Sequence, residues 1–356
     1  MKCVVLLSDG IDSAIAAHLL KAVGHTVLGL HLVKGNPEGD RVGGEGGQAL
    51  KTSAAAEAEK HARELELDDF LCLDITEEFE AEIIRDFLNG YRRGLTPNPC
   101  VRCNRLIKFG RALELAKRLG ADKLSTGHYI RCEYSEKYRT HVLRKGADSS
   151  KDQSYFLSSI RKEVLPMLTF PLGPLQKREV RVIAQRLGLT FSEKKDSQEI
   201  CFVPGDSYQK FLAARGIPES PGEIYDHQGK RVGAHTGYQN YTIGQRTKMH
   251  FSRALSEKLF IYEIDAGANR LYVGPYDFLM KETATISDTT WYVPLEDREY
   301  RCVIRKKAKE ELTRVTSLGG DRYRLSFAHE VFAVTPGQTA ALYDEEGILI
   351  GSGVLV

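Results

Sequence analysis

The chain has 356 residues, 42% of them hydrophobic, and a formal net charge of +2. This length allows two or three domains, and the small charge excludes a globally basic nucleic-acid binder, so any such site must be a local patch. No apolar run of about 18 residues is present, which predicts no membrane span. Met1 and Lys2 lead directly into an apolar run, so we expect no signal peptide. Seven cysteines in such a chain favour reduced thiols and a cytoplasmic location.

The first feature is a polar loop between a predicted strand, residues 3–7, and a predicted helix that begins near Ala14 and stops at Gly24. Backbone N–H groups, serine hydroxyls and the helix dipole would all favour phosphate at this place. No Gly-Lys-Ser/Thr follows, so the loop is not a Walker A sequence. The alternative is an ordinary strand–turn–helix in which Asp and Ser are caps. The loop reads Ser8-Asp9-Gly10-Ile11-Asp12-Ser13.

This loop resembles the pyrophosphate-binding loop Ser-Gly-Gly-x-Asp-Ser of the ATP pyrophosphatases. These enzymes adenylate a substrate and release pyrophosphate. One position departs from their pattern, because Asp9 stands where they have Gly.

The first half of the chain alternates strand and helix patterns. Further strands are predicted at residues 26–32, 70–75 and 122–126, and helices at residues 49–67, 76–91 and 106–119, the last stopped by Gly120. Thr76 is the expected N-cap of its helix. The alternation predicts an α/β fold with a parallel sheet and helices on both faces, so that ligands bind at the carboxyl ends of the strands. The glycine-rich residues 34–48 are either a flexible surface loop or a lid.

The second half of the chain has a different residue pattern. Helical periodicity fades after Leu212, and short β-rich runs alternate with turn signals such as residues 226–229, 265–267 and 318–320. We expect a catalytic α/β domain at residues 1–205, a small central β-rich domain at 206–278 and a C-terminal β-barrel at 279–356.

Two cysteines, Cys100 and Cys103, form a Cys-x-x-Cys pair after two prolines, in a segment that we expect to be irregular. A helix is predicted to begin near Asn104, and Arg102 and Arg105 flank Cys103. The helix N-terminus and the positive charge of the arginines both favour a thiolate at Cys103. The spacing supports zinc ligation, redox exchange or cluster ligation. A structural zinc site would need a second pair, which the sequence lacks.

The other cysteines divide into two groups. Cys201 follows a run of polar and charged residues, so we expect it on an accessible loop, and together with Cys103 it suggests a two-thiol mechanism. Four single cysteines in strand-like runs are expected to be small buried hydrophobic residues: Cys3, Cys72, Cys132 and Cys302.

Motifs along the whole chain resemble those of the MnmA-type tRNA 2-thiouridylases, and they occur in that family's order. They are residues 8–13, 96–99 with Cys103, Asn104 and 107–109, 126–129, 151–157, 170–173, 195–197 with 200–202, 241–246 and 334–338.

The resemblance implies a reaction. ATP, with Mg²⁺, adenylates the C2 oxygen of the wobble uridine in certain tRNAs, and a persulfide sulfur then replaces the activated oxygen to give 2-thiouridine. Cys201 matches the cysteine that carries the persulfide, and Cys103 matches the nucleophile that assists sulfur release or forms the linking disulfide. A persulfide donor or relay protein is the implied partner. A low-pKa thiolate suits this chemistry near neutral pH.

The same resemblance implies the binding residues. ATP contacts are implied for Leu6, Leu7, Ser8, Asp9, Gly10, Ile11, Asp12, Ser13, Leu32 and Gly127. Contacts with tRNA are implied for Asn98, Pro99 and Cys100 around the target base, and for His128, Lys151, Asp152, Gln153, Arg305, Lys306 and Gln338 elsewhere. Without the resemblance, the basic run at residues 305–309 is a solvated strand face, residues 151–153 are a solvated turn, and His128 is as readily a structural histidine.

Two departures leave alternatives open. Asp9 places a carboxylate beside the phosphates, which suggests a catalytically impaired tRNA-binding paralogue unless Asp9 turns away or meets Mg²⁺. Cys100 stands where many family members have Asp, so Cys100, Cys103 and Cys201 are possible ligands of an iron–sulfur cluster in place of a persulfide relay. A third alternative is an amidating or thiolating enzyme for a small molecule, against which the basic run in the last domain argues.

Overall fold

The structure is a computed structural model that describes residues 1–35, 53–189, 200–203, 208–246, 250–251 and 258–356. Most of the predicted loop at 34–48, the motif residues 195–197 and the boundary near 205 fall outside these residues. The chain forms two compact units. The first comprises Met1–Ile83, Val101–Gln198 and Glu346–Leu349, and the second comprises Ile84–Cys100, Glu199–Glu345 and Ile350–Val356.

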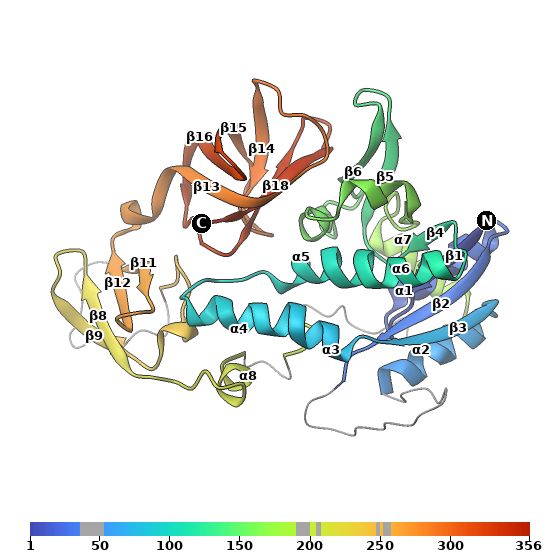
Figure 1. Ribbon diagram of the computed structural model, residues 1–356, viewed down its shortest axis with the longest axis horizontal. Helices are drawn as coiled ribbons and strands as arrows, with labels where there is room; N and C mark the ends of the chain where they lie inside the picture. The colour runs from blue at the N-terminus through green and yellow to red at the C-terminus, as the bar shows by residue number, and fades with distance from the viewer. Residues whose placement is uncertain (36–52, 190–199, 204–207, 247–249, 252–257) are drawn as a thin grey trace. The chain divides into compact units, whose positions relative to one another are not determined.

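A five-stranded parallel sheet forms the centre of the first unit (Figure 1). Every neighbouring pair is parallel, and Cys3 in the middle strand lies between Val27 and Lys123. Apolar runs without alternation, such as residues 27–30, are typical of strands buried on both faces. The predicted parallel sheet is therefore confirmed. Its order is β3 (Asp69–Asp74), β2 (Thr26–Val33), β1 (Lys2–Leu6), β4 (Lys123–Ser125) and β7 (Leu168–Thr169).

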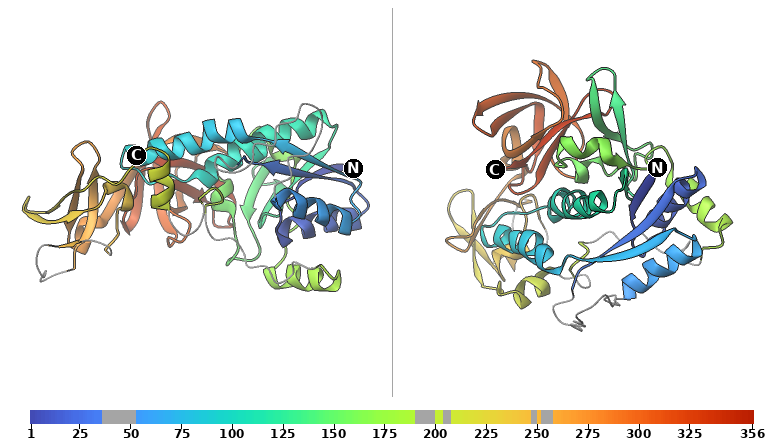
Figure 2. Two further views of the ribbon diagram at one scale, coloured as in Figure 1. Left: turned by 90° about the horizontal axis from the view of Figure 1, so that it is seen from below. Right: turned by 45° about the vertical axis from the view of Figure 1, so that its right-hand side comes forward.

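Helices cover both faces of this sheet. On one face Cys3, Val5 and Leu7 share a core with α1 (Ile11–Ala22), α2 (Ser53–Glu64) and α7 (Lys177–Arg186). Because side chains alternate along a strand, Val4 and Leu6 face the other side. Figures 1 and 2 show α2 and α6 (Ala112–Arg118) on opposite sides of the strands.

Glycine ends two of these helices as predicted. Gly24 and Gly120, with φ of 83° and 70°, lie just beyond α1 and α6, in the left-handed region that glycine adopts without strain. The predicted N-cap role of Thr76 is wrong. Thr76 is the first residue of α3 (Thr76–Phe79), and its hydroxyl donates to Asp74 and accepts from the N–H of Gly35, so it joins the ends of two strands instead.

The helix before the cysteine pair continues from α3 through η1 (Glu80–Ile84) to α4 (Arg85–Arg92). The next helix begins earlier than predicted, with α5 (Pro99–Cys103), which runs into η2 (Asn104–Arg111) and α6. Proline suits a first helical position because its fixed φ matches the helix and its missing N–H would have no partner there. Cys100 and Cys103 therefore lie on a helical turn, which corrects the irregular segment expected from the prolines.

The first unit is completed by an antiparallel hairpin and short helical turns. These are β5 (Ile130–Ser135), β6 (Thr140–Lys145), η3 (Ser154–Leu157) and η4 (Lys162–Met167).

The second unit contains a mixed sheet and a closed barrel (Figure 2). The sheet has the order β10 (His250–Phe251), β9 (Arg231–His235), β8 (Gly222–Asp226), β12 (Arg270–Gly274) and β11 (Phe260–Asp265). The barrel runs β13 (Met280–Trp291), β16 (Arg322–Phe332), β15 (Glu311–Gly319), β14 (Glu299–Val303), β17 (Thr339–Tyr343) and β18 (Leu349–Leu355). The short helices are α8 (Tyr208–Ala214), η5 (Tyr238–Asn240) and η6 (Tyr276–Leu279).

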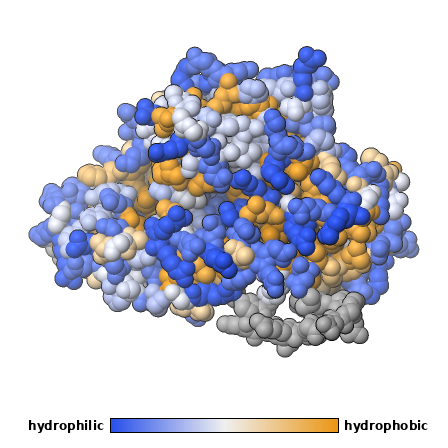
Figure 3. Space-filling view, in the orientation of Figure 1, coloured by the Kyte–Doolittle hydropathy of each residue, from blue (hydrophilic) through white to orange (hydrophobic). Residues whose placement is uncertain are grey.

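The barrel confirms the β-rich C-terminal fold, and the predicted turns at 226–229, 265–267 and 318–320 join neighbouring strands. Figure 3 shows hydrophilic side chains over much of one face, with apolar side chains in smaller groups between them. Among the described residues, no helix is long and apolar enough to cross a membrane.

Candidate functional site

The loop at residues 8–13 lies at the carboxyl end of β1 and opens into α1. The N–H of Ser8 donates to the hydroxyl of Ser13 at 3.0 Å, and the N–H of Gly10 donates to the hydroxyl of Ser8 at 3.2 Å. These two amides are engaged within the loop, so the groups left to meet a phosphate are the N–H groups in the first turn of α1.

Neighbouring strands bring further predicted residues to this edge. A side-chain carbon on Gly127, just after β4, would lie 2.6 Å from the backbone of Asp12 and Ser13, so only glycine permits this approach. Leu32 lies near the carboxyl end of β2, and the N–H of Leu7 bonds to β2 at Leu30. The structure thus gathers the predicted nucleotide residues at one edge of the sheet.

A buried ion pair that we did not predict from the sequence lies at the start of α1. Lys177, 6% exposed, donates to both carboxylate oxygens of Asp12 at 2.8 Å. The hydroxyl of Tyr129 donates to the same carboxylate, and its ring lies beneath the Lys177 ammonium. The only signal in the sequence is a lysine at the first position of an amphipathic helix, a position where a cation is not favoured by the helix dipole. Its location therefore points to a partner.

Two buried histidines accompany Asp9. His31 on β2 donates from Nδ1 to the carbonyl of Leu7 at 2.8 Å, and Nδ1 of His61 on α2 lies 3.3 Å from the carbonyl of Ser8. Burial lowers the pKa of both rings, and the Asp9 carboxylate partly opposes that effect. The unusual carboxylate therefore has two imidazoles in its electrostatic surroundings, which the sequence did not reveal.

The cysteine pair lies on α5, between two anchored segments. Ser159 donates to the carbonyl of Val101, and Asn104 donates to the carbonyl of Phe156. Arg102 forms an ion pair with Glu82 at 3.0 Å and also bonds to the backbone of that residue. The positive charge expected to act on Cys103 is thus partly neutralised by Glu82. Cys100 and Cys103 are both half-buried.

Cys201 is exposed in a turn of the second unit. Cys103 belongs to the first unit, so their joint action stays a prediction. All seven cysteines lie in the described part of the chain and carry thiols rather than disulfides. The expectation of burial is correct for Cys3 and Cys302, whereas Cys72 and Cys132 are half-buried.

Burial nevertheless raises the pKa of each of the four strand thiols, to about 12 for Cys132 and Cys302. A thiol with such a pKa stays protonated near neutral pH and is a poor nucleophile. These four cysteines are therefore structural.

The predicted tRNA residues of the first unit have protein partners. His128 is half-buried, its Nδ1 lies 2.6 Å from the Thr126 hydroxyl, and burial together with Lys108 holds its pKa well below the usual value. The carboxylate of Asp152 accepts from Gly146 and Ser154, and the side chain of Gln153 accepts from the N–H of Tyr129. These bonds shape the turn at 151–153, and contact of Lys151 with tRNA stays a prediction.

The predicted tRNA residues of the barrel lie just after β14 and just before β17. The run at 305–309 lies in the connection between β14 and β15, rather than on a strand face. Lys306 is exposed, and the Arg305 guanidinium stacks over the Phe332 ring at 5.9 Å. The side-chain amide of Gln338 donates to the carbonyl of Thr96 at 2.8 Å.

A metal site was the alternative for the three accessible cysteines. Among the residues that the structure describes, no three histidine, cysteine or acidic side chains are grouped in a way that could hold a metal ion. The geometry therefore gives the iron–sulfur alternative no support.

Comparison with known proteins decides the family. Residues 1–205 match the family description "tRNA methyl transferase HUP domain", residues 209–275 match "tRNA methyl transferase PRC-barrel domain", and residues 281–355 match "Aminomethyltransferase beta-barrel domain". The tRNA-specific 2-thiouridylase MnmA of Petrotoga mobilis is 42% identical over 99% of this chain and 97% of its own length. The chain belongs to the tRNA-specific 2-thiouridylase family.

Other relatives agree. The proteins of the same name from Geobacter metallireducens and Thermotoga sp. (strain RQ2) are 38% and 37% identical, each over 99% of this chain, and over 96% and 98% of their own lengths. This confirms the resemblance inferred from the motifs. Among solved structures, NMN synthetase from Francisella tularensis is 15% identical over 55% of this chain and 66% of that chain, with a TM-score of 0.34, a similarity too low to bear on function.

Proposed function

We propose that this chain is an ATP-dependent tRNA 2-thiouridine synthase. It adenylates the C2 oxygen of a wobble uridine and replaces that oxygen with sulfur carried as a persulfide on Cys201. The observation that carries the proposal is the sheet edge where Gly127 contacts the start of α1 and Lys177 pairs with Asp12, in a chain that belongs to the 2-thiouridylase family.

ATP would bind at this edge through the loop at 8–13, with Leu6, Leu7, Leu32 and Gly127 around it. The start of α1 favours phosphate because its unsatisfied N–H groups and dipole present positive potential. Lys177 neutralises Asp12, so this carboxylate repels a bound phosphate less than its formal charge suggests.

Mg²⁺ would accompany ATP and supply charge neutralisation of the phosphates. Carboxylate oxygens are its preferred protein ligands. Asp12 is unsuited to it, because Lys177 and Tyr129 already bond to its carboxylate. Asp9, half-exposed at the start of the loop, has the right donor chemistry. If Asp9 does not bind the metal ion, its carboxylate repels the phosphates instead, and the two roles predict opposite effects of Asp9→Gly on ATP binding.

The chemistry then needs two thiols. The uridine C2 oxygen attacks the α-phosphate of ATP and pyrophosphate leaves, which converts a poor leaving group into AMP. The terminal sulfur of the Cys201 persulfide attacks C2, and AMP leaves. The Cys103 thiolate attacks the Cys201 sulfur of the resulting disulfide, which releases 2-thiouridine and joins Cys103 to Cys201; a thiol reductant restores both.

The proposal places tRNA against both units. Asn98, Pro99 and Cys100 would surround the target base, and His128, neutral near pH 7, would offer it an uncharged ring. Lys151, Arg305 and Lys306 would contact phosphates, which positions tRNA without reading its sequence. A persulfide-bearing protein would reload Cys201. A cytoplasmic location, where thiols stay reduced, fits this chemistry.

Mass spectrometry of tRNA nucleosides from cells that lack this gene tests the proposal. We expect 2-thiouridine to disappear and to return with the parent gene or with Cys72→Ser, a control thiol outside the site. Unchanged 2-thiouridine would contradict the proposal. An ATP–pyrophosphate exchange assay distinguishes the active enzyme from a non-catalytic tRNA-binding paralogue. The paralogue would bind tRNA without exchanging pyrophosphate.

A further inference from the structure

We infer that Gln338 is a positioning residue that fixes the segment carrying Cys100 and Cys103. Its side-chain amide donates to the carbonyl of Thr96 at 2.8 Å, and the N–H of Thr96 donates to the carbonyl of Pro336 at 3.0 Å. The backbone on both sides of Thr96 is thus bonded to one loop of the barrel. The catalytic importance of this arrangement rests on the proposed function of the cysteines.

The barrel loop that holds Thr96 is itself hydrogen-bonded to β18. The N–H of Gly337 donates to the carbonyl of Leu355, and the N–H of Leu355 donates to the carbonyl of Gln338. Gly337 has φ of 89°, and a side-chain carbon there would lie 3.1 Å from Leu95 and Thr96. Only glycine therefore allows the loop to lie this close to the segment.

The position of Thr96 is transmitted to the cysteines by stiff residues. Pro97 and Pro99 have fixed φ angles, and Pro97 packs against Gly90 of α4, where a side-chain carbon would lie 2.9 Å from its ring. Three residues separate Thr96 from Cys100, which lies on the first turn of α5. A displaced Thr96 therefore displaces the start of α5, where Cys100 lies.

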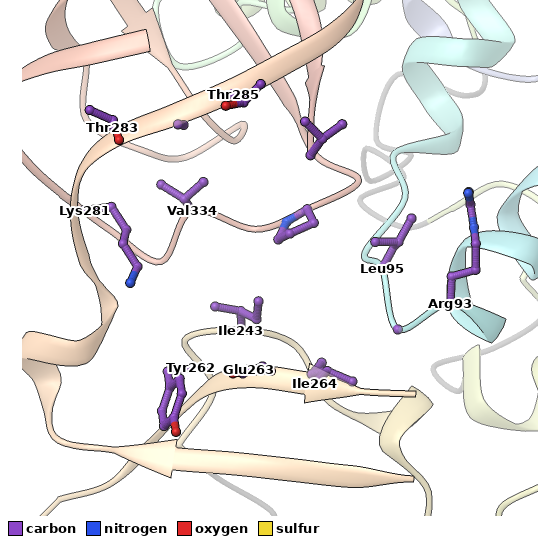
Figure 4. Close-up of a pocket in the computed structure, with 14 residues that line it drawn as sticks. Arg93, Leu95, Ile243, Tyr262, Glu263, Ile264, Lys281, Thr283, Thr285 and Val334 are labelled. Atoms are coloured by element: carbon purple, nitrogen blue, oxygen red, sulfur yellow. The ribbon is translucent and has the colours of Figure 1, made fainter. Parts of the chain in front are cut away.

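One side of the segment borders a cavity. Arg93, Gly94 and Leu95 line a space of about 470 Å³ whose other walls include Ile243 and Val334 (Figure 4). Because this side of the segment lacks close packing, the bonds from Gln338 and Pro336 hold it together with the contacts of Gly337 and Pro97 on its other sides.

Two roles of Gln338 make opposite predictions. A residue that contacts tRNA affects only tRNA binding, whereas a positioning residue affects the thiols of the protein without tRNA. The test is the rate at which iodoacetamide alkylates each cysteine in the tRNA-free protein, measured peptide by peptide, for Gln338→Met. Loss of one hydrogen bond is expected to change the rates at Cys100 and Cys103 by about fivefold, with the exposed Cys201 as internal reference.

Three further variants make the test decisive. Gln338→Lys keeps an N–H donor and should restore the parent rates, and Gln228→Met, on the exposed turn after β8, should leave them unchanged. Gln338→Glu keeps the shape but has no donor, so it should act as Gln338→Met does and serves if that variant misfolds. Alkylation rates that equal those of the parent in both donor-less variants would overturn the inference, whether or not tRNA binding falls. This assay needs neither tRNA nor ATP, so its failure is distinct from failure of the proposed function.

Discussion

The nucleotide loop and the cysteine segments differ in how constrained and how accessible their side chains are. The loop at 8–13 lies at the edge of a buried parallel sheet, and its hydroxyls, its Asp12 carboxylate and the neighbouring histidines all have partners. Cys100 and Cys103 lie half-buried on a five-residue helix, and Cys201 is exposed in a turn. Stabilising phosphate requires fixed dipoles, whereas a sulfur carrier must reach a donor and an acceptor. The fold therefore separates rigid binding from accessible chemistry.

The four strand cysteines sharpen this contrast. Their residue type is that of Cys103, but burial raises the pKa of each. The presence of a thiol is therefore not enough to identify a nucleophile, because these four are poor nucleophiles near neutral pH.

The largest expected effect is loss of thiolation in Cys103→Ser and Cys201→Ser. A hydroxyl cannot carry a persulfide or resolve a disulfide at neutral pH, so single-turnover formation of 2-thiouridine should be abolished. ATP binding, measured by calorimetry, should persist because the loop is untouched. Cys72→Ser is the matched control. Near-parent thiolation in either variant would show that its assigned role is wrong.

Next in size is the stability change in Lys177→Met. Breaking a buried ion pair costs about 3–5 kcal/mol. Because the Asp12 side chain is 30% exposed, water screens part of that cost, and we expect a loss of about 2–3 kcal/mol in the free energy of unfolding. Denaturant unfolding followed by circular dichroism measures it.

Two controls accompany this measurement. Lys60→Met breaks an exposed pair with Glu64 and should change the free energy of unfolding by less than about 0.5 kcal/mol. Adding Asp12→Asn to Lys177→Met should recover part of the loss, because no unpaired carboxylate remains. Equal stability of Lys177→Met and the parent would exclude a structural role for the pair.

A smaller effect is expected at Asp9. A unit charge 4 Å from a phosphate costs on the order of 4 kcal/mol at an effective dielectric of about 20, and solvent, Mg²⁺ and the nearby histidines reduce that figure. We expect Asp9→Gly to tighten ATP binding by about tenfold, or about 1.4 kcal/mol, and Asp9→Asn by less. Loss of Asp12 should weaken it. Calorimetry with and without Mg²⁺ decides, and weaker binding of Asp9→Gly in Mg²⁺ would make Asp9 a metal ligand instead.

The basic connection after β14 should have an electrostatic effect on tRNA binding. Replacing Arg305 and Lys306 with Ala should lower affinity and flatten the slope of log affinity against log salt by about one unit for each lost phosphate contact. Filter binding at several salt concentrations measures this slope. An unchanged slope would show that this connection does not contact tRNA.

The smallest effect is a pH dependence of stability near the loop. Burial lowers the pKa of His61, although the Ser8 carbonyl and the carboxylates of Glu57, Glu64 and Asp9 partly oppose it. Below pH 6.5 the unfolded chain therefore binds more protons at this residue than the folded chain does. The free energy of unfolding is unaffected by His61 above pH 6.5 and decreases as the pH falls below it. Thermal unfolding between pH 7.5 and 5.5 should show a shallower decline in His61→Gln than in the parent.

The sequence predicted what depends on local pattern. The parallel sheet, the glycine stops at Gly24 and Gly120, and the loop before α1 follow from apolar runs and turn residues. The Lys177–Asp12 pair joins residues 165 positions apart, and His61 reaches the loop from another helix, so neither has a local signal. The early start of α5 was missed because two prolines indicated an irregular segment, whereas Pro99 is the first residue of the helix.

The central claim is that the loop activates uridine with ATP and the accessible thiols deliver sulfur. Its most direct test is nucleoside mass spectrometry after the purified chain is incubated with unmodified tRNA, ATP, Mg²⁺ and a persulfide donor. We predict 2-thiouridine at the wobble position, formed only with ATP and accompanied by one pyrophosphate per modified uridine. Unmodified uridine under these conditions, or 2-thiouridine that forms without ATP, would contradict the account.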